Sequence, residues 1–302
     1  MTRRTVAKML TGALLPPVLR RGGADAGDST QARRYRADAQ VLVLSLPILR
    51  RSGVGGGSVT WREWREPGGL MRQLEFTGYS TPERAAGLNR MGFIREKSSR
   101  EDQAVRESNY FGVMTASAEE SADEARKALH STATEAAYTA IEGRIAGGQV
   151  ETATAHFMGP ARLSPDRRSE LLQRAAQALS TAPKKPPEFR TGGSIPPPFL
   201  HALADALRVP GREQSQYVYS GRLYRLWVRR AADTHAAAYF HNQGLVGPGA
   251  KVVRVSGKVR REAGGKETEF RVWVEDGAAQ PVPLRIDFQP KSYLRLIFEA
   301  EV

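Results

Sequence analysis

The run Phe270-Arg271-Val272-Trp273-Val274-Glu275 decides the fold class of this 302-residue chain. Its aliphatic and aromatic residues recur at a period of two, which is typical of a β-strand with one face buried. The same alternation recurs in four further segments, at 224–229, 253–260, 284–288 and 293–300. Turn sequences such as Ala263-Gly264-Gly265 and Asp276-Gly277 lie between the segments. The last third therefore predicts an antiparallel sheet with one solvent-exposed face, curved around a core or an apolar cavity.

The first half predicts further strands, together with several helices. Residues 33–51 alternate as a strand, Gly53–Ser58 (GVGGGS) predicts a turn, and strands at 59–64 and up to Phe76 complete a three-stranded meander. Residues 95–108 are polar and predict a loop, and residues 138–157 predict a hairpin around Gly147-Gly148. Capping residues and apolar periodicity predict helices at 81–91, 118–129, 164–179 and 199–207.

Together these patterns predict an α+β protein dominated by antiparallel sheet, a curved half-barrel with several short helices packed against it. We expect residues 27–181 to form a β-meander plus helices, and residues 199–302 to form an antiparallel C-terminal half. Residues 182–198 are rich in proline and glycine and predict a hinge or surface connection between the two halves.

The N-terminus carries the pattern of an export signal. Thr2-Arg3-Arg4-Thr5-Val6-Ala7-Lys8 resembles the twin-arginine motif, and a short apolar run at 9–19 and the triplet Ala24-Asp25-Ala26 follow it. The run is shorter than the roughly 20 residues that span a bilayer. We therefore expect residues 1–26 to be a signal peptide, with Arg3 and Arg4 read transiently by the twin-arginine export machinery. The expected location is the periplasm or cell envelope.

The charge of the chain favours anionic partners. The formal net charge is +13, and removal of residues 1–26, which hold five basic residues and one acidic residue, leaves +9. Such a balance suits nucleic acid, anionic lipid or cell-wall polymer, although an arginine-rich solvated surface explains it equally well. Basic residues beside tryptophans predict an anionic-surface contact on the first meander, formed by Arg50, Arg51, Trp61, Arg62, Trp64 and Arg65.

The chain lacks the residue patterns of most common catalytic and metal-binding sites. The chain has no cysteine, which excludes disulfides, thiolate zinc sites, iron–sulfur clusters and cysteine nucleophiles. Asp233, His235 and His241 lack the further ligand that a metal site needs, and the glycine run at 53–58 is not followed by a helix, as a phosphate-binding loop requires. We therefore predict no metal, no cofactor and no catalytic residue, and we lean away from an enzyme.

The strands of the last third resemble a known group of proteins. The run at 270–275, Pro283-Leu284-Arg285-Ile286 and Ser292-Tyr293-Leu294-Arg295-Leu296 resembles the closing strands of exported bacterial proteins known as a domain-of-unknown-function family. Residues 219–224 fit the same pattern. The resemblance implies a half-barrel similar in shape to periplasmic lipoprotein carriers. It implies no catalytic residues, and the predicted middle helices depart from a plain half-barrel.

Three functions stay open from the sequence. The first is an exported, non-enzymatic envelope protein that binds or carries an amphiphilic or anionic ligand on its concave apolar face, near Tyr224, Leu226, Phe270 and Phe288. The second is an envelope hydrolase of unfamiliar type that acts on polysaccharide or cell wall, which requires converging carboxylates. The third is a cytosolic nucleic-acid-binding protein, which the export signal disfavours. The oligomeric state does not follow from the sequence.

Overall fold

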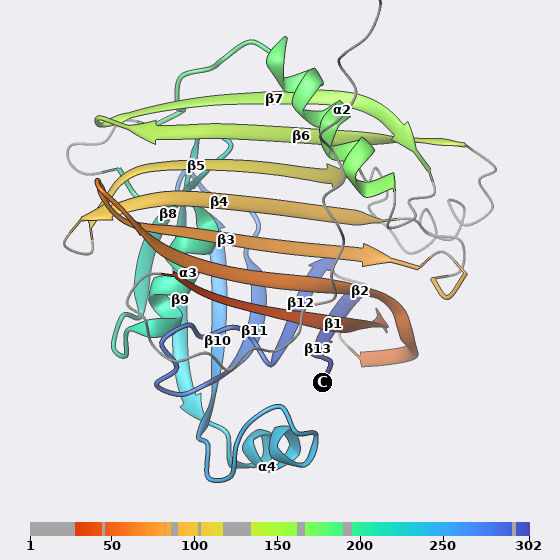
Figure 1. Cartoon of the computed structure of the whole chain (residues 1–302). Helices are drawn as coiled ribbons and strands as arrows, with labels where there is room; N and C mark the ends of the chain where they lie inside the picture. The colour runs from red at the N-terminus through yellow and green to blue at the C-terminus, as the bar shows by residue number, and fades with distance from the viewer. Residues whose placement is uncertain are drawn as a thin grey trace, which may run out of the picture.

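One curved sheet contains every strand that the computed structural model describes, and each strand is antiparallel to its neighbours (Figure 1). The structure describes residues 28–43, 46–81, 83–85, 90–101, 104–116, 134–161, 167–189, 195–291 and 294–302. The N-terminal half supplies β1 (Asp28–Val43), β2 (Leu46–Glu66), β3 (Gly69–Ser80), β4 (Met91–Glu101), β5 (Ala104–Thr115), β6 (Glu135–Ala146) and β7 (Gln149–Pro160). The C-terminal half supplies β8 (Gln214–Tyr219), β9 (Arg222–Ala232), β10 (Val252–Arg261), β11 (Thr268–Glu275), β12 (Arg285–Lys291) and β13 (Leu294–Ala300). The helices are α2 (Arg168–Ser180), α3 (Phe199–Arg208) and α4 (Thr234–Asn242).

The strand order shows how the two halves join. The sheet runs from β7 down to β1, continues directly into β13, and then runs down to β8. The joint is the pairing of β1 with β13, in which Tyr35 lies opposite Ala300 and Val41 opposite Leu294. The curved antiparallel sheet is thus confirmed. The α+β class is corrected to a predominantly β architecture, because the described residues hold only three helices against thirteen strands of one open sheet.

The sheet is bent so that its two halves face each other. In Figure 1 the strands β2–β7 form the front layer, β8–β12 lie behind them, and α3 lies between the layers. We call the face that contacts α3 the inner face, and the opposite face, on which α2 packs, the outer face. Leu171, Ala175 and Leu179 of α2 pack on buried residues of β4–β7, among them Tyr138 and Val113. Helix α4 packs on the other half, where Trp273 is buried beside Phe240.

The predicted loop at 95–108 is wrong, since residues 95–101 form most of β4 and residues 104–108 form the start of β5. Their alternation is hidden because both faces carry polar groups. Glu96, Ser98 and Arg100 point inward and are buried, whereas Arg95 and Lys97 lie on the outer face. A strand whose buried face is ionic has no apolar period for a sequence pattern to detect.

The predicted turn at Gly53–Ser58 is also wrong, because these residues lie inside β2 and Gly55–Ser58 pair with a strand on each side. Gly57 pairs with Tyr35 and with Gly78, and a Cβ on Gly57 would stand 3.3 Å from the Phe298 ring. Gly57 therefore makes room for an aromatic ring on the inner face, and the run continues the strand instead of reversing the chain. Of the glycines in this run, only Gly53 has a positive φ, +63°. It lies beside an irregularity in the pairing of β1 with β2, and its N–H donates to Asp38.

The proline-rich segment after α2 links the two edges of the sheet. Lys185 exchanges two backbone hydrogen bonds with Thr152 of edge strand β7, at 2.7 and 3.1 Å. The Glu188 N–H donates to the Gly221 carbonyl in the β8–β9 turn, and the Val218 N–H of edge strand β8 donates to Pro197. The segment predicted as a connection thus runs across the opening between β7 and β8 in the described residues.

The other predicted elements either agree with the structure or lie outside the described residues. The hairpin around Gly147-Gly148 is confirmed as β6–β7, and the helices predicted at 164–179 and 199–207 correspond to α2 and α3. The predicted helix at 118–129 and the signal peptide with Arg3 and Arg4 lie outside the described residues. Of the helix predicted at 81–91, a turn at 83–85 is described.

Candidate ligand-binding site

Helix α3 is held inside the curved sheet by a buried carboxylate at its N-terminus. Both oxygens of Glu96, a fully buried residue of β4, accept backbone hydrogen bonds, from Leu200 at 2.9 Å and from His201 at 3.0 Å. These two N–H groups are otherwise unpaired in the first turn of a helix, and the helix dipole favours a negative group there. The helix has no capping side chain of its own, because its N-cap is Pro198. A residue about 100 positions earlier in the chain therefore caps α3.

A second ionic contact holds the other end of α3. Asp205 accepts hydrogen bonds from Arg72 of β3 at 2.8 Å and from both terminal nitrogens of Arg100 of β4 at 3.0 Å. Arg72 also donates to Glu63 at 2.6 Å and lies over the Trp61 ring at 5.0 Å. Burial alone would raise the pKa of Asp205, but the two guanidinium groups hold it below its usual value. The polar residues of β3 and β4 thus fix one side of α3.

Burial shifts two neighbouring titrations in opposite directions. Burial raises the pKa of Glu96 to about 8, against the lowering effect of the two backbone hydrogen bonds. Burial, with the nearby charges of Arg72 and Arg100, lowers the pKa of His201 to about 3. The Nδ1 atom of this histidine lies 3.4 Å from the Ser98 hydroxyl oxygen. At neutral pH the folded protein therefore holds His201 neutral and favours the protonated form of Glu96.

These shifts predict a stability plateau with a loss on each side. Between about pH 4.5 and 6.5 the unfolded chain carries one proton on His201 and the folded chain carries one on Glu96, so the two effects cancel. Above pH 6.5 the folded chain alone keeps its proton, and stability falls by about 1.4 kcal/mol per pH unit, about 2 kcal/mol by pH 8. Below pH 4.5 the unfolded chain binds two protons and the folded chain one, so stability falls again.

Urea unfolding of the wild type and of Glu96→Gln between pH 4 and 9 measures this profile. The glutamine variant removes the titrating carboxyl, so the fall between pH 6.5 and 8 should disappear. His201 then acts alone, so the loss of stability on the acid side should begin below pH 6.5 instead of below pH 4.5. Equal slopes in the two proteins above pH 6.5 would contradict the assignment of that slope to Glu96.

An apolar cavity of about 240 Å³ lies beside α3 on the inner face. We call it the inner cavity. Its walls come from both layers and from the helix, and they include Val59, Phe76, Leu203, Phe270, Phe288 and Phe298. The Phe76 and Phe298 rings meet edge to face at 5.8 Å between centroids. The lining is almost wholly hydrophobic, so the inner cavity offers contact area to an apolar group and few directed hydrogen bonds.

The structure separates the four residues predicted to contact a ligand. Phe270 and Phe288 line the inner cavity. Leu226 is fully buried in the cluster that packs on α3, and Tyr224 stacks on Tyr217 at 5.0 Å in the same cluster. All four lie on the concave side, but only the two phenylalanines border open space in the inner cavity.

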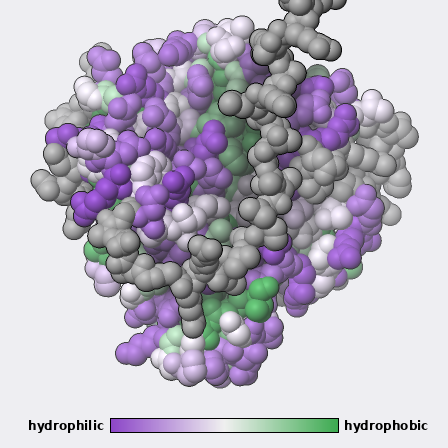
Figure 2. Space-filling view, in the orientation of Figure 1, coloured by the Kyte–Doolittle hydropathy of each residue, from purple (hydrophilic) through white to green (hydrophobic). Residues whose placement is uncertain are grey.

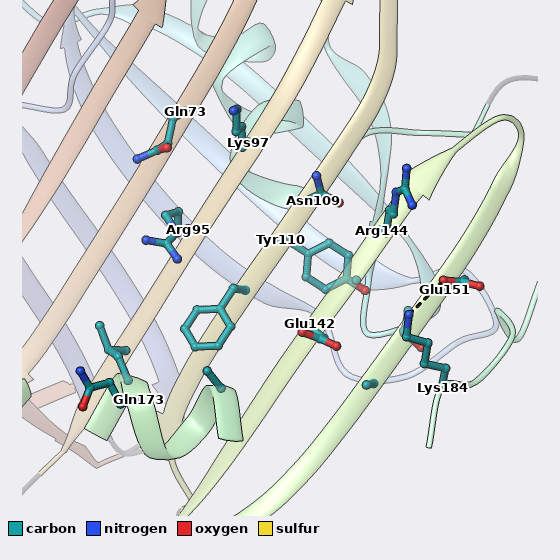
Figure 3. Close-up of a pocket in the computed structure, with 16 residues that line it drawn as sticks. Gln73, Arg95, Lys97, Asn109, Tyr110, Glu142, Arg144, Glu151, Gln173 and Lys184 are labelled. Atoms are coloured by element: carbon teal, nitrogen blue, oxygen red, sulfur yellow. Dashed lines mark hydrogen bonds and ion pairs between the residues drawn. The ribbon is translucent and has the colours of Figure 1, made fainter. Parts of the chain in front are cut away.

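A larger groove of about 760 Å³ lies on the outer face, between α2 and the strands β3–β7. We call it the outer groove. Figure 2 shows a narrow hydrophobic strip across the N-terminal strands on this face, with hydrophilic side chains on both sides. Figure 3 shows Gln73, Lys97, Asn109 and Arg144 arranged across successive strands, with Arg95 and Glu142 nearer the helix. Leu172 and Ala176 of α2 form the apolar wall.

The predicted anionic-surface contact is divided between the two faces. Arg62 and Trp64 lie on the outer face, where the Arg62 guanidinium is 4.9 Å from the Trp64 ring and the Lys97 ammonium 5.2 Å from it. Trp61 is only 3% exposed and lines the inner cavity, so its place on that surface is corrected. Alternation explains the correction, because residues three apart in a strand point to opposite faces. Arg50 pairs with Asp38 at 3.0 Å, and Arg51 and Arg65 are exposed.

The sequence reasoning missed the ionic residues that hold α3. Glu96 and Arg100 lie in the predicted loop at 95–108, and His201 and Asp205 lie in the helix predicted at 199–207, for which the sequence pattern indicates no site. One signal was available, since Glu96, Ser98 and Arg100 recur at a period of two with Arg95 and Lys97 between them. The alternation of two polar sets is compatible with a strand that is buried on an ionic face.

The described residues hold neither a cluster of metal ligands nor a membrane-spanning helix. No group of three or more histidine, aspartate or glutamate side chains gathers there as metal ligands. Asp233, considered above as a ligand, accepts the Ala236 N–H at the start of α4 and the Trp273 indole N–H. Within the same part of the chain, no helix has the length and apolar character needed to cross a membrane.

Comparison with known proteins gives one similar structure. No family model matches the chain, and no curated protein matches it. Among solved structures, the chain is similar to the crystal structure of a β-barrel-like protein of the domain of unknown function DUF1849 from Brucella abortus. The TM-score is 0.36 and the sequence identity 9%, over 89% of this chain and 95% of that chain.

Proposed function

We propose that this protein binds an apolar or amphiphilic ligand in the inner cavity and holds it without chemical change. The observation that carries the proposal is the inner cavity itself, a space of about 240 Å³ with hydrophobic walls inside a curved sheet. A cavity of roughly 150 Å³ suffices for benzene, and drug-sized ligands occupy about 300–1,000 Å³. The inner cavity therefore suits a short acyl chain or a small ring system, with any polar end directed outward.

A binding role accounts for the ionic residues beside the inner cavity. Glu96 and Asp205 are the buried carboxylates with shifted pKa values next to it, and each of them contacts α3. These carboxylates position the helix that supplies Phe199, Leu203 and Leu207 to the cavity wall. We therefore assign them a structural role, and we favour binding over hydrolysis.

The proposal also places the protein in the cell envelope. This part rests on the twin-arginine pattern at Arg3 and Arg4 and on the small-residue triplet at 24–26. Mass spectrometry of the N-terminus of protein recovered from its own cells tests it, and an intact Met1 end in the cytoplasm would oppose it. Transient contact with the export machinery belongs to the same proposal.

Narrowing the inner cavity should weaken ligand binding. Leu203→Phe adds volume to a wall of the inner cavity, so the affinity for N-phenyl-1-naphthylamine, a small apolar fluorophore, should fall at least tenfold. Fluorescence titration of the full chain gives the affinity, and competition with fatty acids of increasing length shows which chain length fits.

The matched control is Leu172→Phe, the same substitution on α2, whose side chain borders the outer groove instead. It should leave the fluorophore affinity within twofold of the wild type. Urea unfolding of both variants separates a filled cavity from a disturbed fold. Failure of the wild type to bind the fluorophore or any of the fatty acids, or equal losses in the two variants, would overturn the proposal.

A further inference from the structure

The outer face carries a straight row of alternating cations and amides. Strand register places one residue from each of six successive strands opposite the next, from β2 to β7. In order, the row is Arg62, Gln73, Lys97, Asn109, Arg144 and Glu151. The basic residues thus occupy every second strand, and an amide lies between each pair of them.

The register fixes the spacing of these charges. Neighbouring strands lie about 4.7–4.9 Å apart, so successive cations of the row stand about 10 Å apart, measured across the strands. The row therefore presents a repeating unit of two groups, one that binds an anion and one that donates and accepts hydrogen bonds. Glu151 ends the row at the edge strand, where it pairs with Lys184 at 3.5 Å.

The three cations are available to a ligand. The side chains of Arg62, Lys97 and Arg144 are 49%, 42% and 61% exposed. Each has one carboxylate partner, respectively Asp28 at 3.5 Å, Glu66 at 3.9 Å and Glu107 at 2.9 Å. Exposed pairs of this kind contribute little to stability, so a carboxylate on a ligand can replace the partner at small cost.

A second row, one step nearer α2, forms the floor of the outer groove. It runs through Arg95, Phe111 and Glu142, which line the groove, and the strand register continues it to Glu75 of β3, outside the groove lining. The Arg95 guanidinium lies 5.9 Å from the Phe111 ring and 5.9 Å from the Phe93 ring. An aromatic ring offers an apolar face to a flat ligand ring, and carboxylates accept hydrogen bonds from hydroxyl groups. Glu142 lines the groove and can accept such a bond, whereas Glu75 accepts a hydrogen bond from the Gln73 amide at 2.9 Å.

From this arrangement we infer that the outer groove binds a linear acidic polysaccharide whose carboxylates recur on alternate sugars. A polymer with a carboxylate on every sugar would place half of its charges against amides, and a neutral polymer would leave the cations unused. The groove is walled by α2 on one side and by Lys184 on another, which suits a narrow chain better than a flat membrane. This site is separate from the inner cavity and does not depend on the proposed function.

Isothermal titration of the full chain with a hyaluronan octasaccharide tests the inference, because this polymer alternates a carboxylate sugar with a neutral one. We expect binding that weakens as salt is raised, and a loss of at least tenfold in the double variant Lys97→Gln, Arg144→Gln. The matched control is Arg225→Gln, Lys258→Gln, which removes two cations, 41% and 51% exposed and ion-paired, from strands of the other half. The control should stay within twofold of the wild type.

The outcomes that would contradict the inference can be told apart from one another. Absence of binding by the wild type overturns it, and equal losses in the two double variants would show a response to net charge alone. Equal affinity for a neutral chito-oligosaccharide would show that the cations do not contribute to binding. Equal affinity for an oligogalacturonide would show that carboxylates on alternate sugars are not preferred. Binding of phosphatidylglycerol vesicles that is lost in the Lys97, Arg144 variant, without octasaccharide binding, would reassign the face to a membrane. Leu203→Phe, which tests the inner cavity, should leave octasaccharide binding unchanged.

Discussion

Replacement of Asp205 by alanine should lower the free energy of unfolding by about 3–5 kcal/mol, the usual cost of removing one partner from a buried ionic contact. The change leaves Arg100 without the carboxylate that it contacts at 3.0 Å and leaves Arg72, whose side chain is 2% exposed, with Glu63 alone. The cost comes mainly from the hydrogen bonds and the opposite charge that the buried guanidinium groups of Arg72 and Arg100 lose at Asp205. Urea unfolding at pH 6, inside the plateau expected from Glu96 and His201, measures the difference without a contribution from their titration.

The control for this experiment is Asp276→Ala. Asp276 pairs with Arg230 at 3.0 Å but its side chain is 40% exposed, so the loss should stay below about 1 kcal/mol. A loss at Asp205 as small as the loss at Asp276 would show that the contact on α3 is weakly coupled to the fold. A large loss at both positions would point to a general sensitivity to charge.

Gly55→Ala should cost about 3 kcal/mol, the upper end of the range for overpacking a tightly packed site. A Cβ on Gly55 would stand 2.0 Å from the Tyr79 carbonyl oxygen and 2.8 Å from the Ser80 Cα, which are backbone atoms of the neighbouring strand. No side-chain rotation relieves such a contact, so the pairing of β2 with β3 has to shift. Thermal or urea unfolding measures the loss.

Gly92→Ala provides the matched comparison, because Gly92 also lies in a strand but a Cβ there would meet no atom within 4 Å. Loss of a glycine then restricts the unfolded chain, and the variant should be neutral or more stable by up to about 1 kcal/mol. Equal destabilisation by the two substitutions would contradict the steric explanation and would implicate strand propensity instead.

The strands with one apolar face were the part of the fold that the sequence predicted well. Around Phe270 the alternation identifies β11, and the register adds a detail that the pattern leaves open. Gly257 lies opposite Phe270, and a Cβ on it would stand 2.1 Å from the Phe270 ring, so the gap in the apolar series of β10 is the space that the ring fills. Gly57 in β2 plays the same part for Phe298, which lies more than 200 residues away. Local sequence gives no indication of such a partner, and a turn was the wrong conclusion.

The candidate sites were harder to predict than the strands. Phe270 and Phe288 followed from the apolar face of the C-terminal strands, whereas Glu96 and Asp205 did not follow from any pattern used. Their roles depend on the docking of α3 between the layers, which brings together residues about 100 positions apart. The basic row of the outer face depends in the same way on register. Arg62, Lys97 and Arg144 are unremarkable in sequence until strand pairing sets them at equal spacing.

The pairing of β1 with β13 has a consequence for the order in which the chain is made. Every other pair in the sheet joins strands that are neighbours in the chain, so each new strand finds its partner soon after it leaves the ribosome. β1 waits for the roughly 250 residues between Val43 and Leu294, which take about 10–50 s at ~5–20 residues per second. Throughout that time one side of β1 presents unpaired N–H and C=O groups, the kind of edge that recruits strands of other chains. A nascent or truncated chain that ends before Leu294 keeps that edge open.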